Sequence, residues 1–263
     1  MKSFSGKQAF ILTVAWLVFG LVAIPSLPAQ ENLLLRVGVT PDYPPLIFRQ
    51  GDTITGVEVD LARRLGQELK RPVTLVPLKW DEQIPALLEK KTDIIMSGMS
   101  VTPAREVRIR FAEPYLKSGL LAAFRAEDLK KYPTREIILN SYSVAAAVKD
   151  TTGDIFLQRN FARGTRKVVL RKAADGVDEL KRRSIDIFIH DAPYILWMVS
   201  ENESVLSALW EPLNQEDLAW GVRKGEEAFF NQVDQAVKKW KSDGTLDTLL
   251  GRWLPAPYLK RFK

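Results

Sequence analysis

One short segment of the chain groups residue types that suit the binding of a carboxylate. The segment is SGMSVTPAR (97–105), and it follows the apolar run IIM (94–96), which predicts the end of a buried strand. Thr102 and Pro103 predict a helix start, with threonine as the N-cap and proline at the first helical position. Arg105 lies in the first turn of that helix. Because backbone N–H groups, hydroxyls and a guanidinium meet there, the segment predicts a binding site for a small acid or an amino acid.

The elements around this segment predict an α/β fold with a mostly parallel sheet covered by helices. Strands are expected at 33–40, 73–77 and 93–96, with helices at 57–69 and 83–90 between them. Strands that alternate with helices in this way are typical of parallel sheets.

The same pattern occurs a second time, which predicts a second lobe of similar layout. Strands are expected at 142–148, 168–170 and 185–189, and helices at 152–161, 175–182 and 192–199. A strand at 218–223 and helices at 226–241 and 246–253 then complete the first lobe. A cleft between two lobes is a usual place for a small ligand.

The predicted domains are a signal peptide (1–29), the first part of lobe 1 (30–124), lobe 2 (125–217) and the C-terminal part of lobe 1 (218–263). Two crossings, near 124–127 and 213–217, are expected to act as a hinge.

The N-terminal residues resemble a secretory signal. Lys2 and Lys7 precede an apolar run (9–24), prolines follow, and Ala29 supplies a small residue before the expected cleavage. An uncleaved membrane anchor is the competing interpretation. Either one predicts export, and we expect the periplasm.

Composition excludes several classes of function. The chain of 263 residues has no cysteine, so disulfides, cysteine-based metal sites and cysteine nucleophiles are excluded. Its formal charge of +6 comes from interleaved acids and bases, which predicts a solvated surface and not a nucleic-acid interface. His190 is the only histidine, and no metal-ligand spacing surrounds it, so we expect neither a metal nor another cofactor.

The motifs, in their order and spacing, resemble the family 3 bacterial extracellular solute-binding proteins that bind polar amino acids. They are LRVGVTPDYPP (35–45), GVEVDLARRLG (56–66), TDIIMSGMSVTPAR (92–105), FAEPYLKSG (111–119) and SIDIFIHD (184–191). The resemblance implies the two-lobed fold of type II periplasmic binding proteins, with two hinge crossings.

The resemblance also implies how the ligand's α-carboxylate is held. Arg105 would clamp it, aided by Ser100 and the backbone N–H of Thr102. Thr152, which we expect to cap a helix in the second lobe, would donate to the same carboxylate. Arginine suits this role because its planar fork matches a carboxylate.

The ammonium end of the ligand is implied to lie against other residues. Asp191 would bind it from the opposite lobe and would also cap the next helix. Oxygens of Ser97 and Gly98 would accept hydrogen bonds from it, and Tyr43 and Trp80 would form apolar walls. Ligand contacts to both lobes would favour a closed cleft.

Two residues near this site have separate expectations. Neighbouring residues on a strand point to opposite faces, so we expect His190 to pack behind the sheet or at a lobe edge. Asp150 stands where the family commonly has a glycine. Its negative charge should weaken anion binding unless the side chain points away.

The leading hypothesis is a monomeric binding protein, not an enzyme, that delivers a polar amino acid to the permease of an ABC importer. A sensory or regulatory ligand-binding module is one alternative. A cyclohexadienyl dehydratase is another, with only His190 and Glu216 as candidate acid–base groups.

Overall fold

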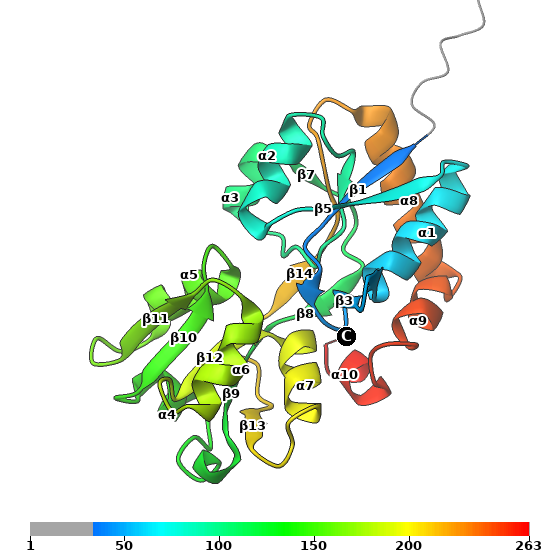
Figure 1. Ribbon diagram of the computed structural model, residues 1–263. Helices are drawn as coiled ribbons and strands as arrows, with labels where there is room; N and C mark the ends of the chain where they lie inside the picture. The colour runs from blue at the N-terminus through cyan, green and yellow to red at the C-terminus, as the bar shows by residue number, and fades with distance from the viewer. Residues whose placement is uncertain (1–33, 263) are drawn as a thin grey trace, which may run out of the picture. The chain divides into compact units, whose positions relative to one another are not determined.

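The computed structural model describes residues 34–262, so the predicted signal peptide lies outside the described residues. Two five-stranded sheets with flanking helices confirm the predicted two-lobed α/β fold (Figure 1). Between residues 34 and 262, none of the helices combines the length and the apolar character that crossing a membrane requires.

The first sheet joins strands from both ends of the described chain. Its order is β5 (Val73–Pro77), β1 (Leu35–Val39), β6 (Ile94–Ile95), β15 (Gly221–Val222) and β7 (Arg110–Phe111). The strand β1 pairs in parallel with β5 and β6, whereas β15 runs antiparallel to β6 and β7. The predicted strand at 218–223 is therefore shorter in the structure, and it returns the chain to this sheet.

Helices from the first and last parts of the chain cover this sheet. They are α1 (Val57–Leu69), α2 (Gln83–Leu88), α3 (Pro103–Arg108), α8 (Glu227–Ser242), α9 (Thr245–Leu250) and α10 (Ala256–Arg261). In α1, Val57, Leu61 and Leu65 are fully buried at helical spacing, as apolar residues of an amphipathic helix should be. Both α8 and α9 contact α1, which places the C-terminal helices beside it (Figure 1).

Small elements connect β1 to α1. They are β2 (Asp42–Tyr43), β3 (Ile47–Gln50) and β4 (Thr53–Thr55), which form a sheet of their own. Gly56 then starts α1 with a φ of 123°, and a Cβ there would lie 2.4 Å from the Leu46 carbonyl oxygen. Glycine is required at this entry because both the backbone angle and the close approach exclude a side chain.

The second sheet holds the predicted strands of lobe 2 and two strands that the sequence did not predict. Its order is β11 (Arg166–Leu170), β10 (Val144–Val148), β12 (Ile187–Asp191), β9 (Leu120–Arg125) and β13 (Leu206–Leu209). The first three are parallel neighbours, and β9 runs antiparallel to β12 and β13. Its helices are α4 (Arg135–Asn140), α5 (Thr152–Asn160), α6 (Ala173–Lys181) and α7 (Ala192–Ser200).

Residues 120–124, which the sequence analysis assigned to lobe 1, lie in the second sheet. All six residues of β9 are buried between β12 and β13. The crossing therefore comes earlier than 124–127, at β8 (Leu116–Ser118), which pairs with β14 (Glu216–Leu218). We propose that these two antiparallel strands mark the lobe boundaries and form the hinge.

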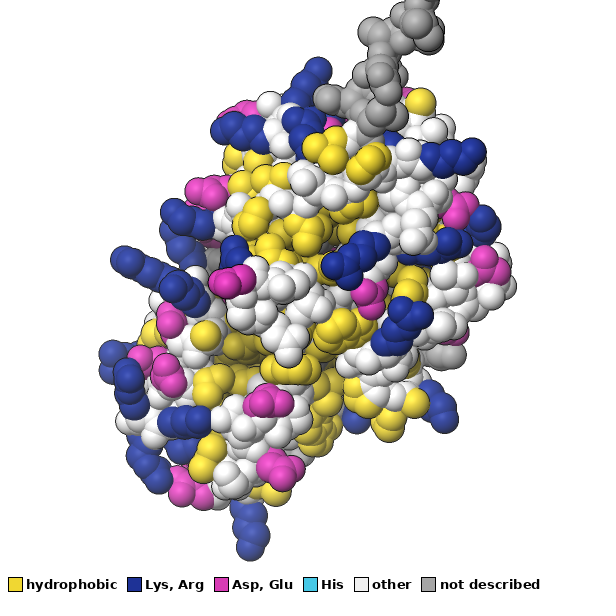
Figure 2. Space-filling model, turned by 45° about the vertical axis from the view of Figure 1, so that its right-hand side comes forward, with side chains coloured by type: hydrophobic (Ala, Val, Ile, Leu, Met, Phe, Trp, Pro, Cys, Tyr) yellow, Lys and Arg dark blue, Asp and Glu magenta, His cyan; other side chains and the backbone are white. Residues whose placement is uncertain are grey.

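The basic residues of the second lobe lie on a mixed surface. Arg163, Arg171, Lys172, Lys181 and Arg182 are all exposed. Figure 2 shows basic side chains projecting around the lower part of the molecule, with acidic side chains between them. This alternation of sign fits a solvated face.

Candidate ligand-binding site

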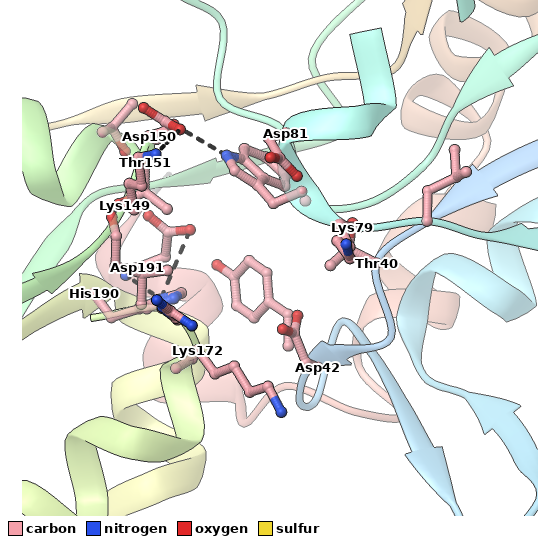
Figure 3. Close-up of a pocket in the computed structure, with 18 of the residues that line it drawn as sticks. Thr40, Asp42, Lys79, Asp81, Lys149, Asp150, Thr151, Lys172, His190 and Asp191 are labelled. Atoms are coloured by element: carbon pink, nitrogen blue, oxygen red, sulfur yellow. Dashed lines mark hydrogen bonds and ion pairs between the residues drawn. The ribbon is translucent and has the colours of Figure 1, made fainter. Parts of the chain in front are cut away.

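A cavity of about 590 Å³ brings together residues of both sheets and their loops. Six of the nine predicted site residues line it: Tyr43, Trp80, Gly98, Arg105, Thr152 and Asp191. Ser97, Ser100 and Thr102 lie outside its wall. Figure 3 shows Thr40 and Asp42 on one side and Asp150, His190 and Asp191 on the other.

Arg105 is held at the cavity by the local structure that the sequence predicted. The Thr102 hydroxyl accepts a hydrogen bond from the Arg105 backbone N–H at 3.3 Å, which confirms Thr102 as the N-cap of α3. Nη1 of Arg105 donates to the Ser100 carbonyl oxygen at 2.8 Å, and the guanidinium lies 5.1 Å from the centre of the Trp80 ring. The hydrogen bond and the ring fix the position of the guanidinium, which leaves other donors of its fork for a ligand.

Burial and neighbouring charges act on Arg105 in opposite directions. Burial lowers the pKa of its guanidinium, and the carboxylates of Asp191 and Glu216 counteract that shift. An arginine stays protonated at neutral pH in proteins. Arg105 therefore presents a partly desolvated positive charge to the cavity.

Hydrogen bonds to neighbouring residues fix the position of the Ser97–Gly98 turn. The Ser97 hydroxyl accepts from the Thr40 N–H at 2.8 Å, and the Gly98 N–H donates to Glu58 Oε1 at 2.7 Å. Gly98 has a φ of 64°, and a Cβ there would lie 2.7 Å from the Tyr43 ring. A side chain at Gly98 would therefore push the Tyr43 ring from the cavity wall.

Glu58 supports this turn, and sequence reasoning missed it. It is 1% exposed in α1, and its carboxylate accepts from the Gly98 N–H, the Tyr115 hydroxyl at 2.7 Å and the Trp220 indole at 2.9 Å. Burial raises its pKa to about 7, although these three hydrogen bonds act against that shift. The only sequence hint is an acidic residue inside an apolar helical stripe.

Glu58 should make the protein less stable as the pH rises. Its folded pKa of about 7 exceeds the ordinary value of 4.5, so the folded state holds the proton more tightly than the unfolded state. The contribution of Glu58 to the free energy of unfolding is therefore greatest below pH 4.5. It falls by up to about 3 kcal/mol as the pH rises to 7 and above. Urea unfolding at pH 5 and pH 8 measures this loss.

Asp191 also has a raised pKa and therefore also lowers the stability as the pH rises. A variant of Glu58 is needed to isolate the contribution of Glu58. We expect Glu58→Gln to have a smaller loss of stability between pH 5 and pH 8 than the natural chain. Glu106→Gln, on the exposed side of α3, should keep the full loss. Equal pH dependence in Glu58→Gln and the natural chain would contradict the assignment.

Asp191 lies at the end of β12, opposite Arg105 in the cavity wall. Burial raises the pKa of its carboxyl to about 6, while Tyr43 and Arg105 act to lower it. It occupies the N-cap position of α7, but its side chain makes no capping hydrogen bond. The prediction that Asp191 also caps this helix is therefore wrong.

Tyr43 was predicted as an apolar part of the cavity wall, but its buried hydroxyl makes this part of the wall polar. Its side chain is 7% exposed, and its hydroxyl has no hydrogen-bond partner among residues 34–262. The hydroxyl nevertheless lies close enough to Asp191 to influence the pKa of that carboxyl. A buried hydroxyl of this kind costs free energy unless a ligand or water binds it.

His190 lines the cavity, so of its two expected places the one behind the sheet is wrong. Its ring lies 5.2 Å from that of Tyr43 and 4.5 Å from that of Tyr194, between ring centres. The alternation of side chains fails here because Asp191, with φ −58° and ψ 144°, already turns from β12 into α7. The sequence predicts the helix start at 192, but it does not show to which face the His190 side chain points.

His190 is neutral in this position. Its Nδ1 accepts a hydrogen bond from the Asp191 backbone N–H at 2.8 Å, so that nitrogen carries no proton. Burial lowers the pKa of the imidazole to about 3. The ring therefore adds an aromatic, uncharged wall beside Asp191.

Ser100 and Thr152 meet at one carboxylate, which belongs to Glu216 in β14. The Ser100 and Thr152 hydroxyls donate to Glu216 Oε2 at 2.5 and 3.0 Å. The helix α5 is capped by Thr151, whose hydroxyl accepts from the Asp154 N–H, so the expected capping role of Thr152 is wrong by one residue. Two neighbouring threonines made the choice ambiguous in the sequence.

Trp80 connects the two sides of the cavity. Its indole N–H donates to the Asp150 carbonyl oxygen at 3.0 Å, a bond drawn in Figure 3. Asp150 has a φ of 60°, which explains why a glycine suits this position. Asp150 is among the residues that line the cavity, and its carboxylate lies 4.0 Å from the Lys149 ammonium, which offsets the charge that it adds.

Charged groups of both signs form the rest of the wall. They are Asp42, Lys79, Asp81, Lys149, Arg171 and Lys172. Sequence reasoning did not single these residues out as ligand contacts. Among residues 34–262, no three acidic or histidine side chains are arranged to hold a metal ion.

Comparisons with known proteins give a consistent result. Residues 35–256 match the family model described as bacterial extracellular solute-binding proteins, family 3. The chain is 26% identical over 277 aligned positions to the L-cystine-binding protein TcyJ of Escherichia coli (strain K12), covering 97% of this chain and 98% of that protein. It is also 26% identical over 260 positions to the cyclohexadienyl dehydratase of Pseudomonas aeruginosa, covering 92% and 94%.

A solved structure is similar over most of its length. The putative binding component of an ABC transporter from Wolinella succinogenes, complexed with lysine, aligns with a TM-score of 0.81 and 28% identity. The alignment covers 86% of this chain and 98% of that chain.

Proposed function

Because the chain belongs to the family 3 bacterial extracellular solute-binding proteins, we propose that it captures a polar amino acid in the cavity between its lobes. The ligand's carboxylate binds Arg105 and its ammonium binds Asp191. The observation that carries the proposal is that one cavity holds both charges, on segments from different sheets. A zwitterion needs this arrangement, since each of its ends requires a partner of opposite charge.

The physiological role that follows is delivery to the permease of an ABC importer. The signal-like N-terminus supports export to the periplasm, and the protein works there as a monomer without a cofactor. The solved Wolinella succinogenes protein, described as a putative binding component of an ABC transporter, supports a transport role. The cavity of about 590 Å³ and its mixed charges accept a polar side chain.

Isothermal titration calorimetry of the purified protein against the proteinogenic amino acids and L-cystine tests this function. We expect at least one of them to bind with micromolar or tighter affinity, in a one-to-one ratio. Absence of binding across the whole panel would refute the proposal.

A dehydratase is the second candidate, because one relative is a cyclohexadienyl dehydratase and Asp191 has a pKa of about 6. A carboxyl group with such a pKa suits proton transfer near neutral pH. Incubation with prephenate, with ultraviolet detection of phenylpyruvate, tests it. Under the binding-protein proposal, no product forms beyond the rate without protein.

A further inference from the structure

Glu216 offers its carboxylate to donors from both lobes. It lies in the hinge strand β14, and its Oε2 accepts from Ser100, which follows β6, and from Thr152, which begins α5. Its Oε1 accepts from the Asn214 side chain at 2.8 Å. One carboxylate thus binds the hydroxyls of two residues to which the family resemblance gives a role in ligand binding.

Each hydroxyl has a single hydrogen to donate. While Ser100 and Thr152 donate to Glu216, neither can donate to a ligand carboxylate. Their remaining lone pairs can only accept, which suits an ammonium. Arg105 is then the main partner left for a ligand carboxylate.

The charges around the cavity lead to the same conclusion. The negative charge of Glu216 influences Arg105 and His190, which line the cavity, and Asp191 and Glu216 repel each other. With His190 neutral, Arg105 is a cation on which both of these carboxylates act. The wall also holds the cations Lys79, Lys149, Arg171 and Lys172. A carboxylate entering this region is repelled by Glu216, whereas an ammonium is attracted.

We propose that Glu216 competes with the ligand's carboxylate for Ser100 and Thr152, and so selects ligands that carry an ammonium group. This inference rests on the proposed function, since it assumes that an amino acid occupies the cavity. It makes Glu216 a specificity-determining residue located in the hinge.

The variant Glu216→Gln tests the inference because it removes the charge and keeps the size of the side chain. The probes are the amino acid that binds most tightly in the calorimetric panel, its decarboxylated amine and its deaminated acid. For serine, for example, these analogues are ethanolamine and 3-hydroxypropanoate. Asp217→Asn is the matched control, because it removes the same charge from the exposed neighbouring residue.

We expect Glu216→Gln to bind the deaminated acid on the order of tenfold more tightly, and the amine more weakly, than the natural chain. Asp217→Asn should change neither affinity. Loss of a purely structural contact would weaken both analogues together, so opposite shifts distinguish the two roles. Thermal unfolding verifies that the variant is folded; if it is not, Glu216→Asp, which withdraws the carboxylate by one carbon, should show the same shifts at smaller size.

Two results would overturn the inference while leaving the proposed function intact. One is an unchanged ratio of acid to amine affinity in Glu216→Gln, and the other is an equal shift in Asp217→Asn. If no amino acid binds the natural chain at all, the proposed function and this inference both fail.

Discussion

Arg105→Ala should bind its amino acid roughly 30-fold to several thousandfold more weakly than the natural chain, a loss of about 2–5 kcal/mol. The ligand's carboxylate would remain in a partly desolvated cavity without its cation. The Ser100 and Thr152 hydroxyls cannot replace it, because both donate to Glu216. Calorimetric titration with the amino acid selected in the panel measures the effect.

Two further variants make this result specific to the guanidinium. Arg105→Lys keeps the charge but not the planar fork, so we expect an intermediate loss. Arg108→Ala removes an exposed arginine from the same short helix and should bind like the natural chain. If Arg105→Ala retained full affinity, the carboxylate would have to bind elsewhere in the cavity.

Asp191→Asn should cause the second large loss, and it should also remove a pH dependence. A ligand ammonium requires the ionised carboxylate, and burial raises the pKa of Asp191 to about 6. Affinity is therefore full well above pH 6 and falls as the pH decreases through 6, by about tenfold between pH 7 and pH 5. Titrations at these two pH values measure it.

In Asp191→Asn we expect low affinity that no longer falls between pH 7 and pH 5. Asp178→Asn, on an exposed part of α6, should keep both the affinity and the pH dependence of the natural chain. Glu216 also faces Asp191 and titrates with a raised pKa, so the comparison with Asp191→Asn isolates the contribution of Asp191. A natural chain whose affinity rises on acidification would contradict the assigned role.

The predicted local structure was correct where a short stretch of sequence determines it. Thr102 and Pro103 start α3, which places Arg105 one turn from the cap. The elements that Val57, Leu61 and the apolar strand segments predict also exist, because helical and strand periodicity depend on near neighbours.

The prediction failed where the partner of a residue is distant in the chain. Glu58 accepts a hydrogen bond from the Trp220 indole, which is 162 positions away in the chain. Glu216 accepts one from the Ser100 hydroxyl, which is 116 positions away. The place of β9 in the second sheet also depends on strands that come much later in the chain, because β9 pairs with β12 and β13. Local patterning carries no information about such partners.

By itself, the sequence determined the family and the alternation of strands and helices. It also identified Arg105 and Asp191 as candidates to bind the two charged ends of an amino acid. Only the tertiary structure showed that His190 lines the cavity and that the Trp80 indole donates to the Asp150 carbonyl oxygen across it. Only the tertiary structure showed that Glu216 accepts hydrogen bonds from Ser100 and Thr152. The physical reason is that hydrogen bonds and desolvation depend on which side chains meet in space. Which side chains meet depends on how the strands and helices of both sheets pack.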